Sequence, residues 1–329
     1  MTQTESVSNL IFTSTEANAF AIQQVDDLRT RKIVGVPFGI KAIDDKMTPW
    51  LPGYLVICTA RPGHGKSTLI LNHAFRYQDY LTAQAKNKTA CVICSWETTI
   101  ENLPLYDYGR RTGTPMSKMA RGEVDDMEFE SIKGAGILHS SNGLFYVGSS
   151  DRFHGKQPPM TIDVVHSCLQ AIEDWAGPKS YKIGPVYLDY LQAITPARVY
   201  ESKAVATGEV VEQVKKLAMD WGTQAILTAQ AKPDVDKQDD PQPGADQTEW
   251  SNVPAKAGDC NFTVMRPCKY KGEGQSVGGI RVEGDMQMGV QFNKQRMGPA
   301  PFREWILFDV KTCQIKGSLE TRTVNLNEE

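Results

Sequence analysis

No run of about 18 apolar residues, the length that spans a bilayer as a helix, occurs in this sequence of 329 residues. The first residues also lack the charged start and apolar core of a secretory leader. We therefore expect neither a membrane span nor export, and we expect the protein to act in the cytoplasm.

A basic excess is missing as well. Lysine and arginine together number 36, against 39 aspartate and glutamate residues, which gives a formal net charge of −3. Proteins that bind nucleic acid through their overall charge carry the opposite balance. Any binding of nucleic acid must therefore come from a local basic patch.

Paired cysteines and clustered histidines, the common signatures of metal sites, are scarce. Seven cysteines are scattered along the chain, and one pair, Cys91 and Cys94, matches C-x-x-C. No second pair follows at zinc spacing, and the flanking residues are apolar. We therefore favour packing in a buried strand over redox or metal chemistry for this pair. The five histidines show no ligand spacing.

What the sequence does contain is an alternation of apolar runs with amphipathic stretches. Four runs are almost continuously apolar, as parallel strands covered on both faces are, at 54–59, 90–95, 186–191 and 225–229. Stretches with helical spacing lie between or beside them, at 67–83, 163–176 and 209–221. This alternation predicts an α/β fold with a doubly wound, mostly parallel twisted sheet and helices on both faces.

The two ends of the chain differ from this body. Residues 15–30 have the spacing of a helix that either packs on its own domain or docks on a neighbour. After a polar segment at 231–258, three strand-like runs separated by glycine-rich turns predict an antiparallel C-terminal hairpin extension. The predicted organisation is a tail and helix over 1–32, one domain over 33–312 and a C-terminal tail over 313–329.

The strongest motif is A-R-P-G-H-G-K-S over residues 60–67. It fits the phosphate-binding pattern G-x-x-x-x-G-K-[ST], except that Ala60 stands in place of the first glycine. Backbone N–H groups of such a turn and the dipole of the following helix both favour a phosphate. We expect Lys66 to neutralise the β and γ phosphates of ATP and Ser67 to bind Mg²⁺. The residues expected to hold the nucleotide are Arg61, Pro62, Gly63, His64, Gly65, Lys66, Ser67 and Thr68.

Three polar residues close other apolar runs. Asp189 ends V-Y-L-D, and we expect it to bind Mg²⁺ together with the P-loop serine. Glu97 follows C-V-I-C-S-W, and because the ends of parallel strands converge on the ligand we expect it to activate the attacking water. The alternative for Glu97 is an acid that only faces solvent. Gln230 closes L-T-A-Q and is the candidate sensor of the γ-phosphate.

Several segments together resemble one family, the DnaB-type replicative helicases with their RecA-like motor domain. Taken in order, these segments cover roughly residues 33 to 310. They are G-V-P-F-G-I-K-A-I-D at 35–44, the P-loop at 60–67, S-W-E at 95–97, M-S-K-M-A-R-G-E at 116–123, L-D-Y-L-Q at 188–192, A-Q at 229–230 and K-Q-R-M-G-P at 294–299.

The resemblance implies a RecA-like P-loop NTPase that assembles into a hexameric ring and hydrolyses ATP at its subunit interfaces. Single-stranded DNA would pass through the centre, with 5′-to-3′ travel and unwinding of duplex DNA. The implied partners are single-stranded DNA, further copies of the chain, and primase or another replication protein of a bacterial or phage-infected cell. We expect the protein to lack the family's helical N-terminal domain, which engages primase, because only 15–30 resembles part of it, the linker helix.

Residues 290–299, V-Q-F-N-K-Q-R-M-G-P, place two cations just before a Gly-Pro turn. Strand alternation predicts that Val290, Phe292, Lys294 and Arg296 share one face. The chain offers the cations no evident acid, and we expect Lys294 and Arg296 to reach the γ-phosphate of a neighbouring subunit, like the lysine and arginine of the family's hairpin. The alternative is a solvated edge strand.

The family resemblance is weakest in the segments expected to meet DNA. Residues 231–250 are acidic, whereas a loop that contacts phosphates is expected to be basic. We therefore take Arg198, Lys203 and Lys256 as the candidate DNA contacts, with ordinary solvated charges as the alternative. The sequence shows no interleaving of aromatic and basic residues that would mark a stacking platform.

Two other functions share the same motifs. A RecA-like ring ATPase that remodels or loads protein or nucleic-acid partners without unwinding is the main alternative, and the acidic segment favours it. A recombinase-like filament is the third, and the K-Q-R hairpin argues against it.

Overall fold

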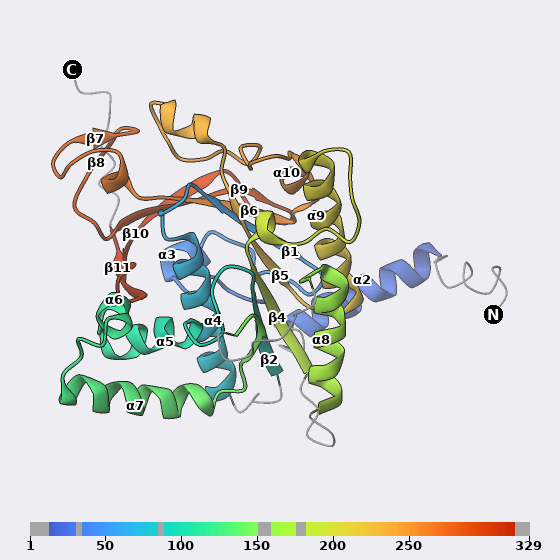
Figure 1. The fold of residues 1–329 in the computed structure, drawn as a ribbon. Helices are drawn as coiled ribbons and strands as arrows, with labels where there is room; N and C mark the ends of the chain where they lie inside the picture. Colours follow the sequence, from blue (N-terminus) through green and yellow to red (C-terminus); the bar gives the residue numbers. More distant parts are fainter. Residues whose placement is uncertain (1–12, 31–34, 85–88, 151–158, 176–181, 320–329) are drawn as a thin grey trace. The chain divides into compact units, whose positions relative to one another are not determined.

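The computed structural model describes residues 13–30, 35–84, 89–150, 159–175 and 182–319 (Figure 1). The chain divides into two compact units, Met1–Val36 and Pro37–Glu329, which are described separately. In the first unit, helix α2 (Ser14–Arg29) begins at a capping box in which the Thr13 hydroxyl and the Glu16 carboxylate satisfy each other's backbone N–H groups. None of its residues is buried within the described part of this unit. The predicted helix over 15–30 is thus present.

The second unit is built on one sheet. Within the described residues, nine strands join in the order β11-β10-β9-β6-β1-β5-β4-β2-β3. Strands β1 to β6 pair in parallel, and β9, β10 and β11 continue the sheet in antiparallel fashion. The strands are β1 (Leu55–Ala60), β2 (Thr89–Ser95), β3 (Phe145–Gly148), β4 (Lys182–Asp189), β5 (Ala225–Gln230), β6 (Cys260–Met265), β9 (Gln287–Gln295), β10 (Phe302–Asp309) and β11 (Gln314–Ser318), with the small hairpin β7 (Ser276–Val277) and β8 (Ile280–Arg281) beside them. The predicted parallel sheet with an antiparallel extension is confirmed.

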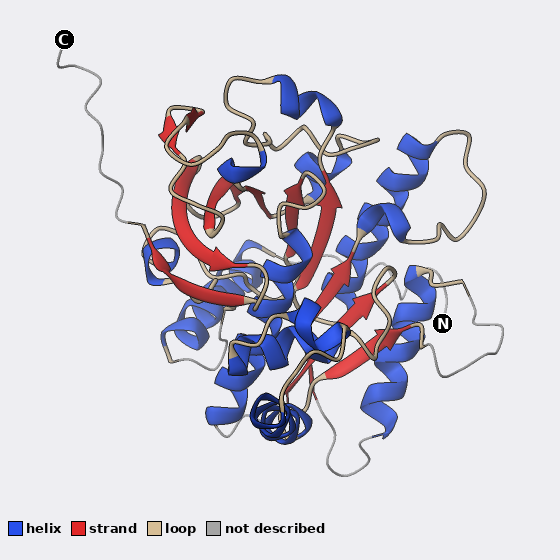
Figure 2. Cartoon of the chain, turned by 60° about the vertical axis from the view of Figure 1, so that its left-hand side comes forward, coloured by secondary structure: helices blue, strands red, loops and turns tan. Residues whose placement is uncertain are grey.

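Helices cover both faces of the parallel part (Figures 1 and 2). One face packs on α8 and α9 through an aliphatic core, and α4 lies on the other, where it also contacts α5. The helices are α3 (Lys41–Asp44), α4 (Lys66–Ala83), α5 (Leu103–Thr112), α6 (Met116–Ala120), α7 (Asp126–Ser140), α8 (Ile162–Trp175), α9 (Lys203–Asp220) and α10 (Val253–Ala257), with 3-10 turns η2 (Leu191–Ala193), η3 (Pro233–Lys237) and η4 (Pro267–Lys269). The predicted doubly wound arrangement, with helices on both faces of the sheet, is confirmed.

The C-x-x-C pair lies in the core. Cys91 and Cys94 are fully buried in β2, and burial raises the pKa of both thiols, which keeps them protonated and unreactive. The described residues contain no group of three or more His, Cys, Asp or Glu side chains that could hold a metal ion. The full burial of Cys91 and Cys94 in β2 agrees with the predicted packing in a buried strand.

Two predicted boundaries differ from the structure. Helix α9 begins at Lys203 rather than 209, because the Ser202 side chain accepts a hydrogen bond from the Val205 N–H and caps the helix there. The tail predicted from residue 313 gives way to β11, which pairs with β10 along the sheet edge. The short run 314–318 has a lysine and a glycine in it and carries little strand signal on its own.

A buried ion network joins α4, α5 and α7. Asp107 is fully buried, and its carboxylate accepts hydrogen bonds from Arg110 (Nε, 2.7 Å) and Arg111 (Nε, 2.8 Å) and contacts His139 Nδ1 at 2.8 Å. Both arginines also bind Asp79 of α4, at 2.6 and 2.5 Å. Burial alone would raise the pKa of Asp107, but the hydrogen bond from His139 and the two guanidinium groups outweigh it and lower that pKa to about 2.

We expect the Asp107→Asn variant to lose about 2 kcal/mol of unfolding free energy at pH 7. The pKa of this carboxyl group is lower in the folded than in the unfolded protein, so its charge stabilises the folded state whenever the pH is above the unfolded-state pKa. This contribution is present above about pH 4 and disappears as the pH falls towards 2. Urea unfolding followed by circular dichroism measures it, with the exposed Asp220→Asn as control. An equal loss in both variants, or a difference from wild type that does not shrink in acid, would contradict the ion-network account.

Candidate functional site

The ends of four parallel strands meet at one edge of the sheet. The P-loop follows β1, and the register places Ala60 opposite Gln230 at the end of β5. Ser95, two residues before Glu97, lies opposite Asp189 at the end of β4, and the Trp96 N–H donates to the Asp189 carbonyl. The structure therefore brings together the P-loop and the three strand-end residues that the sequence singles out.

The turn of the P-loop depends on its glycines. Gly63 and Gly65 have φ angles of 77° and 84°, in the left-handed region that side chains rarely adopt. A Cβ on Gly65 would lie 2.8 Å from Val310 Cγ1, so a larger residue would also clash. Gly65 caps α4 without a side-chain hydrogen bond, which leaves the first N–H groups of the helix without that partner, as an anion site at a helix start requires.

Asp189 is surrounded by groups that fit a magnesium–nucleotide complex. Its Oδ1 accepts from the hydroxyls of Ser67 (2.9 Å) and Thr228 (2.5 Å) and lies 3.5 Å from Lys66 Nζ. The Lys66 ammonium is buried, and its carboxylate contact at 3.5 Å is longer than a close hydrogen bond. Mg²⁺ in nucleotide sites takes one or two protein oxygens and completes its shell with phosphate oxygens and water. The Ser67 hydroxyl and the Asp189 carboxylate, 2.9 Å apart, are the two oxygens that would hold such an ion.

Two P-loop side chains point away from the loop. Arg61 donates from Nε to Asp236 (2.9 Å) and from Nη1 to the Ala231 carbonyl (3.0 Å). His64 is buried, and its Nδ1 accepts from the Arg266 N–H. Burial lowers the pKa of His64 to about 4, so the ring is neutral at neutral pH. Both residues were predicted to hold the nucleotide, and we now infer that their side chains fix the loop instead.

Glu97 and a tyrosine missed at the sequence level complete this edge. The Glu97 carboxylate is exposed and forms no hydrogen bond or ion pair within the part of the chain that the structure describes. The Lys66 ammonium lies over the ring of Tyr190, 4.9 Å from its centre. Burial and the nearby carboxylates of Glu97 and Asp189 raise the pKa of the Tyr190 phenol. Tyr190 directly follows the metal-side aspartate, which is the only sequence signal that it carried.

The prediction that Lys294 and Arg296 share a face with Val290 and Phe292 is wrong. Phe292 of β9 pairs with Phe262 of β6, but the next pair joins Lys294 to Asn261, so Asn293 is an extra residue that forms a β-bulge. A bulge shifts the side-chain alternation by one position. Lys294 therefore lies on the opposite face from Phe292.

That face carries the short helix α10. The Lys294 ammonium donates to the carbonyls of Ala255 (3.1 Å) and Lys256 (2.8 Å), near the end of the helix. Burial lowers the pKa of Lys294. A cation is favourable at this end of a helix because the last carbonyls lack backbone partners. Lys294 and Arg296 thus still share a face, but the Lys294 ammonium is bound within the chain whereas the Arg296 side chain is exposed.

The expectation that Arg296 has no acid within its own chain is also wrong. Its Nη1 lies 3.1 Å from Oδ1 of the buried Asp259, while its own side chain is 62% exposed. The other oxygen of Asp259 is held by Lys215 Nζ (2.6 Å) and the Leu55 N–H (2.8 Å). Arg296 is therefore the outermost member of this cluster and the one open to solvent.

Arg296 is far from the P-loop of its own chain. The start of β9 touches the P-loop, since a Cβ on Gly65 would lie 3.1 Å from Met288 Cε. The eight steps along the backbone from Met288 to Arg296 follow the sheet and cover roughly 25 Å at about 3.4 Å per residue. Arg296 cannot reach a phosphate bound by its own chain.

The structure gives two of the candidate DNA contacts an aromatic neighbour. The Arg198 guanidinium lies 5.2 Å from the ring centre of Tyr200, and the Lys203 ammonium lies 4.6 Å from that of Trp250. The third candidate, Lys256, is exposed on α10. The pairing of Lys203 with Trp250 joins segments almost fifty positions apart and could not be read from the sequence, whereas Arg198 and Tyr200 are two positions apart and could have been noticed.

Comparison with known proteins gives one consistent family. A family model described as the DnaB-like helicase C-terminal domain matches residues 35–312. The replicative DNA helicase DnaB of Leifsonia xyli subsp. xyli is 24% identical over 266 residues, which cover 80% of this chain and 54% of that protein. The DnaB of Haemophilus influenzae is 23% identical over 270 residues, 81% of this chain and 52% of that protein. The chain thus spans about half the length of the curated relatives it matches.

Solved structures show the same fold. A structure of an ATPase domain on its own matches with a TM-score of 0.76 at 18% identity, covering 94% of this chain and all of that one. A DnaB-like replicative helicase, studied together with its interactions with primase, matches with a TM-score of 0.73 at 18% identity, covering 91% of this chain and 66% of that one. Among the described residues, no helix is long and apolar enough to cross a bilayer. With a RecA-like sheet, a P-loop at its edge and a family model that spans most of its length, this chain belongs to the DnaB-like helicase C-terminal domain family.

Proposed function

We propose that this chain is the motor of an ATP-driven hexameric ring that moves along single-stranded DNA in the 5′-to-3′ direction and unwinds duplex DNA. The observation that carries the proposal is the placement of its charges. The nucleotide groups Lys66, Ser67 and Asp189 lie at one end of the sheet, and the exposed Arg296 lies roughly 25 Å away at the other. A head-to-tail ring brings these two ends together between neighbouring subunits.

The residues at the sheet edge divide the work of hydrolysis. Lys66 and the first N–H groups of α4 would neutralise the phosphates, and Ser67 and Asp189 would hold Mg²⁺, which would supply further positive charge to the transferred phosphate. Glu97 orients the attacking water and accepts its proton. Gln230, beside the start of the P-loop, responds to the γ-phosphate. Arg296 of a neighbouring subunit completes the site.

Exposed apolar side chains support assembly. Helix α2 exposes Ile22 and Val25, and α7 separately exposes Met127 and Ile137. Each helix therefore carries apolar surface that solvent does not favour and that a second copy would cover. We include primase or another replication protein among the proposed partners because one structural relative was studied with primase.

The acidic segment 231–250 is compatible with DNA nearby because several of its charges have partners within the chain. Asp236 binds Arg61, Asp240 binds Arg303 at 2.7 Å, and Asp234 binds Lys237 at 2.7 Å. Exposed pairs of this kind contribute little stability, but they do reduce the local negative potential. The cations proposed to contact single-stranded DNA are then Arg198, Lys203 and Lys256.

Stimulation of ATP hydrolysis by single-stranded DNA tests the proposal. We expect the steady-state rate with ATP and Mg²⁺ to rise several-fold on addition of an oligodeoxynucleotide, and a forked duplex with a free 5′ arm to be opened. The Lys66→Ala variant is the control that lacks turnover. A flat ATPase rate and an intact fork would favour the ring ATPase that remodels partners without unwinding.

A further inference from the structure

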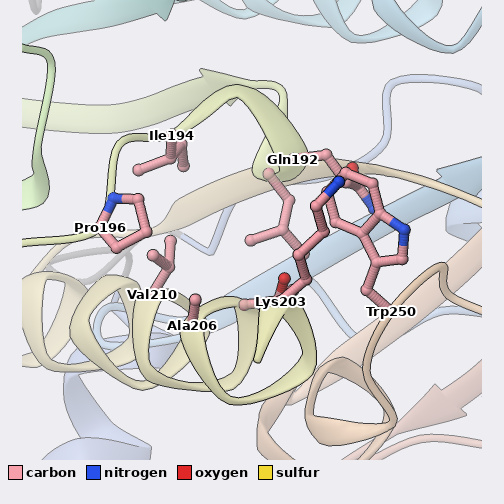
Figure 3. Close-up of a pocket in the computed structure, with 9 residues that line it drawn as sticks. Gln192, Ile194, Pro196, Lys203, Ala206, Val210 and Trp250 are labelled. Carbon is pink, nitrogen blue, oxygen red and sulfur yellow. The ribbon is translucent and has the colours of Figure 1, made fainter. Parts of the chain in front are cut away.

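A pocket of about 240 Å³ opens between η2 and the first turns of α9, on the side of the molecule that carries Lys203 (Figure 3). Ile194, Pro196 and Val210 give it an apolar lining, and Trp250 and Lys203 stand at the opposite end in this view. Its volume is below the roughly 300–1,000 Å³ of sites for drug-sized ligands, so it suits a single planar ring system.

Trp250 is held in a costly conformation. Its φ angle is 68°, in the left-handed region that bulky residues rarely occupy, and strain of this kind is concentrated at functional sites. The indole is 37% exposed although it is a large apolar group. The neighbouring chain is fixed, because the Glu249 N–H donates to the Gln230 carbonyl and Thr248 bridges Ala231. The strained backbone therefore presents an aromatic face beside the pocket.

Charge around the pocket indicates the chemistry of its occupant. The ammonium of Lys203 lies over the Trp250 ring. Arg198 lies over the ring of Tyr200 and is exposed on the loop that leads from η2 into α9. An apolar protein side chain could fill the pocket but would make no favourable contact with these cations. A nucleotide uses both, because its base stacks on an aromatic ring while its phosphate meets a cation.

We propose that this pocket holds one unstacked base of a nucleic-acid single strand against Trp250, with Lys203 and Arg198 on the flanking phosphates. The inference rests on the proposed function and adds that the strand is held by its bases as well as by its backbone. Gln192, which lines the pocket, accepts from the Gln230 N–H at 3.1 Å and donates to the Gln230 carbonyl at 3.5 Å. A base in the pocket would thus touch a residue that fixes the γ-phosphate sensor.

Binding of labelled oligothymidylate, followed by fluorescence anisotropy with a non-hydrolysable ATP analogue and Mg²⁺, tests the proposal. We expect Trp250→Ala to weaken binding about 5- to 150-fold, the effect of losing about 1–3 kcal/mol of stacking per base. Trp250→Phe is expected to stay within about threefold of wild type, since it keeps an aromatic face. Tyr80→Ala, which removes an exposed ring from α4, is the matched control and is expected to change nothing.

Salt dependence and abasic strands separate the two parts of the site. Trp250→Ala is expected to leave the slope of log affinity against log salt unchanged, while Lys203→Ala reduces its magnitude by about 0.7 for each phosphate that is no longer neutralised. Wild type is expected to bind an abasic strand more weakly than a normal one, and Trp250→Ala to remove that difference. Equal binding of both strands by wild type would overturn the proposal.

The remaining outcomes are also decisive. If Trp250→Ala binds DNA normally but shifts the oligomeric state in sedimentation velocity, the pocket receives a side chain of a neighbouring subunit and the proposal fails. If wild type prefers normal strands over abasic ones but opens no fork, the base site stands and the proposed unwinding fails. Intact unwinding by Trp250→Ala, with unchanged binding, would leave the proposed function in place and remove the base site.

Discussion

Replacing Arg296 with alanine is expected to lower ATP turnover about 10³- to 10⁵-fold while ATP binding stays within a few-fold of wild type. A guanidinium supplied to the γ-phosphate from a neighbouring subunit stabilises the charge of the transition state, and its removal costs about 4–7 kcal/mol of activation free energy. Arg296 is roughly 25 Å from its own P-loop, so the loss cannot come from the nucleotide site of the same chain. Phosphate release measures turnover, and a fluorescent ATP analogue measures binding.

Arg121→Ala provides a matched control for this prediction. The Arg121 side chain is 59% exposed and pairs with Glu123, whereas Arg296 is 62% exposed and pairs with Asp259. The Arg121–Glu123 pair is exposed on both sides and contributes at most about 1 kcal/mol, whereas the acid that pairs with Arg296 is buried. Asp259 keeps the ammonium of Lys215 when Arg296 is removed, so its buried charge stays neutralised. If both arginine variants hydrolyse ATP at the wild-type rate, Arg296 returns to the role of a solvated edge residue.

A mixture of two inactive subunits distinguishes a site in trans from a site in cis. Arg296→Ala subunits keep an intact P-loop, and Lys66→Ala subunits keep an intact arginine. In a mixed ring, some interfaces join the two good halves, and activity is expected to reappear at those interfaces. A mixture that stays inactive, although sedimentation shows mixed assemblies, would contradict the arrangement in trans.

The parts of this site that follow from local chemistry could be predicted from the sequence. Glycines and a lysine-serine pair at the start of a helix predict a phosphate turn, and the structure places Gly63 and Gly65 in the left-handed conformations that such a turn needs. Asp189 and Gln230 close apolar runs, and parallel strands bring such ends together. The register between β1, β5 and β4 did not need to be known.

The parts that depend on pairing between distant segments could not be predicted. A single extra residue, Asn293, reverses the face of Lys294, and nothing in V-Q-F-N-K-Q-R announces a bulge. Asp259 precedes Arg296 by 37 positions, and only the antiparallel pairing of β6 with β9 makes them neighbours. The aromatic partner of Lys203 was hidden for the same reason, since Trp250 reaches it from another loop.

Replacing Glu97 with glutamine is expected to lower turnover about 10²- to 10⁴-fold, the contribution of a positioned general base. Glutamine has nearly the same shape but cannot accept the proton of the attacking water. The exposed carboxylate has no partner within the described residues, so its loss breaks no ion pair and leaves the fold unchanged. Because the P-loop is intact, Glu97→Gln is expected to bind ATP normally and to hold single-stranded DNA in the presence of ATP.

Glu249→Gln is the control that makes the Glu97 prediction specific. Glu249 also lies near Tyr190, where its charge contributes to the raised pKa of the phenol, but it approaches from the loop after β5 rather than from a strand end. Removing a negative charge there is expected to change turnover less than about threefold. If Glu249→Gln abolishes turnover and Glu97→Gln does not, the base comes from the loop that carries Trp250. A DNA strand bound beside Trp250 would then act directly on the catalytic carboxylate. A large loss for Glu97→Gln alone assigns proton transfer to the end of β2, in the row of strand-end residues that also holds Asp189 and Gln230.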